Sequence, residues 1–372
     1  MKIVFIGAKG IPAVSGGVEA HVDELSRGLV RAGHEAVVYV RDWYTPRRLL
    51  SWQGVRLIHL PTIRTKHLDA TIHCLLASIH VLFIKADVIH YHAVGPAAFA
   101  VLPRLFGRRV VVTIHRRDWA ADKWKAPARL LLKAAEWAAV RTPRAVIAVA
   151  ATIRDGLAKG GRTSPVVIPN GFVAPLPLPP GPASARFGLA ARRYVLFLGR
   201  LVPEKRPDWL IRAFLERRSK GDGLKLVLAG ASSGTDDYVR GLKALAGSDP
   251  RIVFTGEIRG QDKDEIASNA LLFVLPSRLE GYPIALLEAL GAGLGCLASD
   301  IPPHREIVRD GVDGLLFRSD DFADFKARLD GLLSDPARIA ALGREARDAA
   351  AARPDWDAVV RRTIEVYRAV RL

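Results

Sequence analysis

The sequence has little cysteine and no hydrophobic run long enough to cross a membrane. Its two cysteines, Cys74 and Cys296, lie far apart in the chain and offer neither a disulfide framework nor a metal-ligand spacing. The longest apolar stretch, residues 71–84, is broken by two histidines and is shorter than the roughly 20 residues that span a bilayer. It predicts a buried helix or a helix at a membrane surface. The apolar run at residues 3–6 is too short for a signal peptide, so we expect a cytoplasmic protein.

Acidic residues are scarce in the first half of the chain. Residues 1–172 contain 25 Lys and Arg against 11 Asp and Glu, whereas residues 173–372 contain 30 against 27. The excess is densest between Arg104 and Arg144. Such a surface suits phospholipid headgroups, lipid diphosphates or nucleic acid, unless it is merely a soluble basic surface. No helix-turn-helix, RNA-recognition or zinc motif accompanies the charge, which leaves a non-enzymatic nucleic-acid-binding protein as a remote alternative.

Two segments of the chain begin in the same way, with an apolar strand, a polar loop and a helix. Residues 2–6 lead to Gly7 and a helical pattern at 18–32, and residues 194–198 lead to Gly199 and a helical pattern at 207–218. Strands that alternate with helices in two sets predict two doubly wound parallel α/β domains. The further strands expected are Ala36–Val40, Val88–His92, Val110–His115, Ala145–Ala148, Lys225–Ala229, Ile252–Thr255, Leu271–Leu275 and Gly295–Ala298.

Prolines mark the junction between the two sets. Five of the ten residues from 173 to 182 are proline, which excludes a helix or a central strand there. Apolar residues recur at helical spacing after position 356. We therefore expect a first Rossmann-like domain at 1–172, a linker at 173–190, a second Rossmann-like domain at 191–355 and a C-terminal helix at 356–372.

The loops after the strands are where ligands of open parallel sheets bind. The loop at residues 7–17 lacks both the dinucleotide fingerprint and the Gly-Lys-Ser/Thr of a P-loop. Gly16 and Gly17 still precede a helix, whose free N–H groups suit a phosphate, although an ordinary turn would also explain them. In the second domain, Arg200 and Lys205 offer positive charge to a diphosphate, unless they form a solvated surface pair.

The most specific segment is residues 276–293, after an apolar strand. Glu280 falls in the loop, near a helix N-terminus, where it can accept hydrogen bonds from sugar hydroxyls. Glu288 lies on an otherwise apolar helix, where burial without a hydrogen-bonding partner would be costly; a ribose diol would satisfy it. The alternative is that both carboxylates simply face water.

In combination, these motifs resemble the retaining glycosyltransferases of family 4, which have the GT-B fold. The resemblance covers the whole chain in the correct order. It implies two Rossmann-like domains facing a central cleft, with the C-terminal helix returning to the first. The matching residues are Glu280 and Glu288 (the Glu-x7-Glu signature), Gly199, Arg200 and Lys205 (the Gly-Arg-Leu-x-x-x-Lys loop), Gly16 and Gly17 (the phosphate loop), His115 (the end of a strand) and Ile168–Gly171 (the end of the first domain).

The resemblance implies a nucleoside-diphosphate-sugar donor (UDP-, GDP- or dTDP-linked) and transfer with retention, without a metal or other cofactor. Arg200 and Lys205 would stabilise the departing diphosphate, while His115 would contact the sugar near its reacting carbon and not act as general base. The leaving phosphate would accept the acceptor's proton. The catalytic residues would be His115, Arg200, Lys205 and Glu280, and the donor-binding residues Gly16, Gly17, Gly199, Arg200, Lys205, Glu257, Ile258, Glu280, Gly281, Tyr282, Pro283, Ile284, Leu287 and Glu288.

A closer resemblance, to bacterial polysaccharide-assembly members that are rhamnosyl- or mannosyltransferase-like, comes from Gly10–Glu19 and from residues 115–124. It implies transfer of a hexose or deoxyhexose to a glycan, as a lipid-diphosphate-linked intermediate of capsule, exopolysaccharide or O-antigen synthesis at the inner face of the membrane. The His is commonly followed by Gly, but here Arg116 and Arg117 follow it. The acceptor side would include His92, Arg116, Arg117, Asp118 and Trp119, and Trp119, Trp124 and Trp137 would face the membrane. The alternative for Trp119 is that it anchors its loop in the core.

Two Asp-x-Asp strings invite a metal interpretation. Asp262–Asp264 and Asp355–Asp357 do not follow apolar strands and are typical of helix beginnings. His90, His92 and His304 have no ligand partners at metal spacing, so no metal site is expected.

The remaining alternative to a glycosyltransferase is another enzyme with the GT-B fold, either a sugar-nucleotide epimerase or a phosphorylase.

Overall fold

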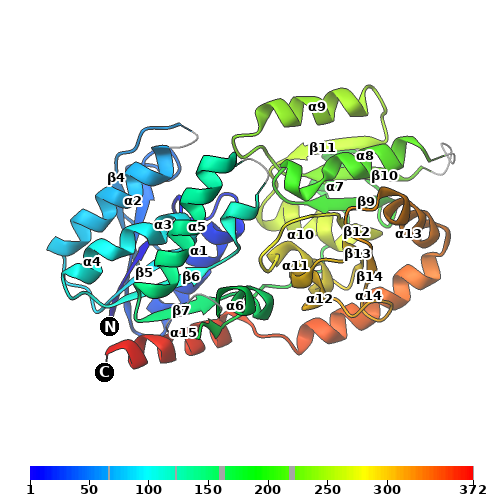
Figure 1. Ribbon diagram of the computed structural model, residues 1–372. Helices are drawn as coiled ribbons and strands as arrows, with labels where there is room; N and C mark the ends of the chain where they lie inside the picture. Colours follow the sequence, from blue (N-terminus) through cyan, green and yellow to red (C-terminus); the bar gives the residue numbers. More distant parts are fainter. Residues whose placement is uncertain (66–67, 122–123, 159–163, 218–222, 372) are drawn as a thin grey trace. The chain divides into compact units, whose positions relative to one another are not determined.

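The computed structural model describes residues 1–65, 68–121, 124–158, 164–217 and 223–371; Lys123 of the expected acceptor loop lies outside them. The chain divides into two compact units, one formed by Met1–Gly171 with Pro354–Leu372 and the other by Phe172–Arg353. Each unit is built on one twisted, mainly parallel sheet with helices packed on it (Figure 1). None of the helices in the described part is long and apolar enough to cross a membrane.

The sheet of the first unit has the order β3-β4-β2-β1-β5-β6-β7-β8, and its paired neighbours are parallel apart from β3 and β4. Its central strands are buried along their whole length, as expected for a parallel sheet covered on both faces. The short edge hairpin of β3 and β4 has no counterpart among the predicted strands. The strands are β1 (Lys2–Ile6), β2 (Glu35–Arg41), β3 (Ser51–Trp52), β4 (Val55–Leu60), β5 (Val88–His92), β6 (Val110–Ile114), β7 (Ala145–Ala148) and β8 (Val166–Val167).

The helices of the first unit include one from the C-terminal end of the chain. Helix α15 packs on α1 (Figure 1), and the hydroxyl of its Tyr367 lies 2.6 Å from Nδ1 of His90 in β5. The expected return of the last helix to the first domain is therefore confirmed. The helices are α1 (Gly17–Arg31), α2 (Leu68–His80), η1 (Val81–Phe83), α3 (Val94–Ala97), η2 (Ala98–Ala100), α4 (Val101–Leu105), η3 (Asp118–Ala120), α5 (Ala126–Arg141), α6 (Ala151–Ala158) and α15 (Trp356–Arg371).

The second unit repeats the architecture with a parallel sheet in the order β11-β10-β9-β12-β13-β14. Two parallel α/β units are thus confirmed. The strands are β9 (Tyr194–Leu198), β10 (Lys225–Ala229), β11 (Ile252–Gly256), β12 (Leu272–Leu275), β13 (Gly295–Ser299) and β14 (Leu315–Phe317), and the helices are α7 (Pro182–Arg186), η4 (Pro203–Lys205), α8 (Pro207–Leu215), α9 (Asp236–Ala246), α10 (Gly260–Asn269), α11 (Ile284–Gly291), α12 (Pro302–Arg305), α13 (Phe322–Ser334) and α14 (Pro336–Ala351).

The proline-rich segment is attached to the second unit. Helix α7 begins at Pro182, a position where the missing N–H costs nothing. The carboxylate of Glu265 in α10 accepts hydrogen bonds from the backbone N–H groups of Gly181, at 2.8 Å, and Ser184, at 2.6 Å. One buried carboxylate therefore caps α7 and holds the segment to α10.

Candidate active site

The carboxyl edge of the second sheet contains an ion pair whose side chains are only 12% and 11% exposed. Lys205, at the end of η4 after β9, donates to Oε1 of Glu280 in the loop after β12. The hydroxyl of Ser277 lies 2.8 Å from the same oxygen. Burial opposes ionisation of Glu280, but the charge and the hydrogen bond of Lys205, together with His304 and the Ser277 hydroxyl, outweigh it, so the pKa of Glu280 lies below its ordinary value. The ion pair therefore joins the Gly-Arg-Leu-x-x-x-Lys loop, which contains Lys205, to the Glu-x7-Glu signature, which contains Glu280.

Arg200 follows β9 in a tightly packed turn. A Cβ on Gly199 would lie 3.4 Å from Cδ of Lys205, so the lysine stem runs across this glycine. A Cβ on Gly230, at the end of β10, would lie only 1.8 Å from the carbonyl oxygen of Gly199. The backbone approach of the two loops therefore requires glycine at position 230, and it fixes the backbone from which Arg200 projects.

Glu288 has a partner inside the protein. The residue is half-buried on α11, and Nζ of Lys263 in α10 lies 2.8 Å from its Oε1. The sequence argument that an apolar helix leaves this carboxylate in need of a ligand hydroxyl is thereby weakened. Glu288 therefore forms an ion pair with Lys263, a partner that the spacing of the Glu-x7-Glu motif does not reveal.

The other expected donor residues differ in exposure. Glu257, exposed after β11, pairs with Arg259 at 2.9 Å, while Ile258 is buried. The hydroxyl of Tyr282 is 3.3 Å from a guanidinium nitrogen of Arg353. The remaining members lie around the start of α11: Gly281, Pro283 and Leu287 are buried, and Ile284 is half-buried.

The glycine loop of the first unit folds back on the helix that it precedes. Gly16 has a φ of 101°, and a Cβ there would lie 2.1 Å from Oε2 of Glu19, whereas a Cβ on Gly17 would meet nothing within 4 Å. The backbone N–H of Lys9 donates to Oε1 of Glu19 at 3.2 Å. Gly17 thus offers an open backbone at the N-terminus of α1, while an acidic side chain lies beside it.

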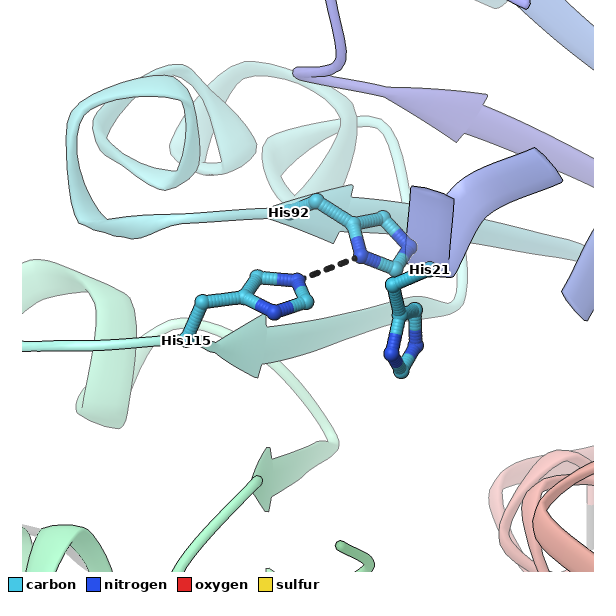
Figure 2. A group of neighbouring side chains, drawn as sticks. All are labelled: His21, His92 and His115. Carbon is cyan, nitrogen blue, oxygen red and sulfur yellow. Dashed lines mark hydrogen bonds between the residues drawn. The ribbon is translucent and has the colours of Figure 1, made fainter. Parts of the chain in front are cut away.

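Three histidines meet at the carboxyl edge of the first sheet (Figure 2). His92 ends β5, His115 follows β6 and His21 comes from α1; Nδ1 of His92 is 3.0 Å from Nε2 of His115. Burial lowers the pKa of His21 to about 4 and holds those of His92 and His115 well below the ordinary value. The expectation that His92 has no neighbours suited to a metal is wrong, because parallel strands end at one edge and bring distant residues together.

The residues after His115 bind one another and α5. Arg117 donates to Glu136 at 2.7 Å, and the indole N–H of Trp119 donates to the same carboxylate at 3.0 Å. The guanidinium of Arg117 lies 4.7 Å from the Trp119 ring centroid. Trp119 is therefore an anchor of this loop on α5. Arg116 pairs with Asp118 at 3.2 Å.

The Asp-x-Asp strings lie at helix starts, as the sequence predicts. Asp262 is in the first turn of α10 and pairs with Arg186 at 2.6 Å. Asp355 caps α15, since its Oδ1 accepts from the N–H of Ala358 at 2.7 Å. Asp357 pairs with Arg31 at 3.2 Å. Each of these three carboxylates therefore has a partner within the protein, either an arginine or the backbone N–H of a helix N-terminus.

Comparison with known proteins matches both units. The model of Glycosyltransferase Family 4 matches residues 15–174, and that of Glycosyl transferases group 1 matches residues 186–349. Glycogen synthase of Mycobacterium tuberculosis (strain ATCC 25618 / H37Rv) is 28% identical over 410 residues, which cover 100% of this chain and 95% of that protein. Sucrose-phosphate synthase from Thermosynechococcus elongatus is 21% identical, with a TM-score of 0.83 over 99% of this chain and 98% of that one. HepE from Anabaena, in complex with UDP-glucose, is 19% identical, with a TM-score of 0.79 over 99% and 100%.

The two units and their matches define the class: the protein is a glycosyltransferase with the GT-B fold. More narrowly, the chain belongs to the family that the two models describe together, the glycosyltransferases of family 4 and group 1.

Proposed function

We propose that this glycosyltransferase moves a hexose or deoxyhexose from a nucleoside-diphosphate sugar to a glycan acceptor, with retention of configuration and without a metal ion. The acceptor proposed is a lipid-diphosphate-linked intermediate of cell-surface polysaccharide synthesis, such as capsule, exopolysaccharide or O-antigen. The observation that carries the donor half is the pair of Lys205 and Glu280, whose side chains are only 12% and 11% exposed, in the loops that follow β9 and β12. The bound UDP-glucose of HepE, which shares the fold, also supports a nucleotide-sugar donor.

In the proposed mechanism, Lys205 binds the diphosphate of the donor and Glu280 binds its sugar. An ammonium group has three N–H donors, and Glu280 receives one from Lys205, so others remain for phosphate oxygens. Both Lys205 and Ser277 contact Oε1 of Glu280, which leaves Oε2 to accept from sugar hydroxyls. Negative charge grows on the diphosphate as the glycosidic bond breaks, and Arg200 and Lys205 stabilise it in a preorganised site.

His115 serves as a neutral contact to the sugar. Its low pKa, caused first by burial and then by the neighbouring histidines, makes it a poor proton donor at pH 7. The hydrogen bond between His92 and His115 orients the ring. The acceptor's proton then goes to the leaving phosphate oxygen, and no protein nucleophile takes part.

The acceptor half of the proposal rests on a basic and apolar surface of the first unit. Helix α5 exposes Leu130, Leu131 and Trp137, each by 60–71%, and its one acidic residue, Glu136, is buried. Exposed apolar side chains of this size mark interaction surfaces, and nearby cations favour anionic lipid. Further exposed apolar residues of the unit include Leu75, Ile79, Phe83, Leu105 and Phe106. The cations on α5 and just before it are Lys125, Arg129, Lys133 and Arg141.

Thermal shifts test the donor. Unfolding temperatures measured with UDP-, GDP- and dTDP-sugars should rise for one nucleotide class, because a ligand that binds the folded state stabilises it. Glu280→Ala should lose the shift produced by the sugar and lose transfer. Transfer that persists in Glu280→Ala would refute the site.

Two further measurements test the reaction itself. Proton NMR of the product gives the anomeric configuration, and activity that survives EDTA supports metal independence.

Flotation with liposomes tests the membrane partner. Vesicles with anionic lipid should carry the protein upward, and neutral vesicles should carry less. Leu131→Glu should reduce flotation, whereas Leu245→Glu makes the same change at an exposed position of α9 in the second unit and should not. Equal absence of flotation with both vesicle types would refute the membrane contact without touching the donor proposal.

The competing proposal is another GT-B reaction, that of a sugar-nucleotide epimerase or a phosphorylase. An epimerase converts the donor in the absence of acceptor, and a phosphorylase requires inorganic phosphate. Product analysis without acceptor, with and without phosphate, separates both from a transferase.

A further inference from the structure

The histidine cluster of the first unit has the geometry of a ligand set. One ring nitrogen from each of His21, His92 and His115 lies within 4.8 Å of the other two. Figure 2 shows the three rings near one another, from the end of β5 (His92), the loop after β6 (His115) and helix α1 (His21). The 3.0 Å between Nδ1 of His92 and Nε2 of His115 approaches the spacing of two ligands on one tetrahedral ion, with metal–nitrogen bonds of about 2.0–2.1 Å.

The hydrogen bonds around the cluster leave the required lone pairs. The side-chain oxygen of Asn170 lies 2.8 Å from Nδ1 of His21. An amide oxygen only accepts, so Nδ1 of His21 carries the hydrogen and Nε2 keeps its lone pair. Such an outer partner is typical of metal-binding histidines, since it fixes tautomer and ring orientation.

His92 can release its contact with His115 without losing a proton. Its Nε2 has no hydrogen-bond partner in the part of the chain that is described. Whichever of the two rings donates in this bond, a shift of its hydrogen to its other nitrogen frees the donor nitrogen for a metal, and each imidazole keeps one N–H.

A fourth histidine close by does not take part. The His90 ring centroid is 4.2 Å from that of His92. Both of its nitrogens have partners, however: Nδ1 lies 2.6 Å from the Tyr367 hydroxyl, and Nε2 lies 2.7 Å from the Thr113 hydroxyl. The ligand set is therefore the three imidazoles of His21, His92 and His115.

We propose that His21, His92 and His115 bind one divalent transition-metal ion, Zn²⁺ foremost, and that the ion inhibits transfer by holding His115 away from the sugar. Three imidazole nitrogens without a carboxylate suit Zn²⁺, Co²⁺, Ni²⁺ or Cu²⁺ and not Mg²⁺ or Ca²⁺. The proposed reaction uses no metal, and His115 is the residue proposed to contact the sugar, so an ion bound at this site would compete with transfer instead of assisting it.

Metal binding can be measured without any assay of transfer, so the result does not depend on the proposed function. Untagged, chelator-stripped protein is titrated with Zn²⁺ against a chromophoric chelator, and with Co²⁺ while the visible spectrum is recorded. We expect one ion per chain and the intense absorption of tetrahedral Co²⁺. His21→Phe should weaken Zn²⁺ binding by at least about tenfold, and Asn170→Ala, which leaves all three ligands in place, by about tenfold.

The control is His73→Phe, which removes a buried histidine of α2 outside the cluster and should leave Zn²⁺ affinity unchanged. Circular dichroism checks that each variant is folded. Wild-type protein that binds no Zn²⁺, or that binds it as tightly as a folded His21→Phe variant does, would overturn the site. Zn²⁺ that binds without slowing transfer would overturn the inhibitory role.

Discussion

Removal of the cation from the buried ion pair should destabilise the second unit and abolish transfer. Lys205→Met keeps the length of the side chain but removes the ammonium group that donates to Glu280. The carboxylate, whose side chain is only 11% exposed, then keeps the Ser277 hydroxyl at 2.8 Å. Loss of one partner of a buried pair costs about 3–5 kcal/mol. Since Ser277 continues to satisfy part of the charge, we expect about 3 kcal/mol.

The double variant Lys205→Met with Glu280→Leu separates stability from function. Replacement of a whole buried pair by apolar side chains is often neutral, so most of the lost stability should return while transfer stays absent. In the single variant, the large effect of burial is no longer offset by Lys205, so we expect the pKa of Glu280 to rise above its ordinary value. The destabilisation is therefore full at neutral pH and shrinks as the pH falls through the raised pKa, since the protonated acid no longer needs a cation.

Urea unfolding at pH 7 and pH 5, followed by circular dichroism, measures these effects. Lys326→Met is the matched control, because Lys326 pairs with Asp330 in α13 of the same unit at 2.7 Å, with side chains 29% and 40% exposed. That pair should contribute less than about 1 kcal/mol. The reasoning fails if Lys205→Met costs no more than this control, or if the double variant is no more stable than the single one.

Three further predictions concern other parts of the molecule. Gly230→Ala should cost about 2 kcal/mol and lower kcat, because its Cβ would meet a carbonyl oxygen at 1.8 Å. Gly234→Ala, at a φ of 70° but with nothing within 4 Å of its Cβ, should cost less and leave kcat intact, and equal effects would refute the contact. Burial lowers the pKa of His304 to about 4, so the folded state binds fewer protons than the unfolded state between about pH 6.5 and pH 4. Stability should fall by about 2 kcal/mol from pH 7 to pH 5 through this group, and His304→Asn should show a smaller fall in urea titrations; an unchanged pH slope would contradict the assignment. Tyr367→Phe should cost about 1 kcal/mol through its lost bond to His90, with unfolding measured in urea, and a cost of zero would mean that the bond contributes nothing.

Patterns local in the sequence predicted most of the fold. Strands such as β1 and β9 are continuous apolar runs that end at a glycine, because both faces of a parallel sheet are covered. The strand Val55–Leu60 escaped prediction because it lies near the sheet edge, where polar and apolar residues mix. The hairpin that leads into it turns at Gln53 and Gly54, both with positive φ, a signal weaker than an Asn-Gly turn.

Contacts between distant residues could not be read from spacing. The Glu-x7-Glu signature locates Glu288, but its partner Lys263 comes from the preceding helix. The sequence likewise separates His21, His92 and His115 by up to 94 positions, and only the parallel register of β5 and β6 brings two of them to one edge. Whether Trp119 faces a ligand or anchors its loop depended on Glu136, a residue of α5 that the motif does not include.

The return of α15 to the first unit has a consequence for biosynthesis. The second unit is an insertion between Gly171 and Pro354 of the first, so it can complete its sheet on the ribosome while the first still lacks its last helix. Domains generally fold as units during synthesis, but here the N-terminal unit finishes last. Until α15 emerges, the surface of α1 that receives Val360 and the ring of His90 that meets Tyr367 stay uncovered. A stop codon shortly before residue 354 would leave the second unit intact and the first as a substrate for chaperones and proteases.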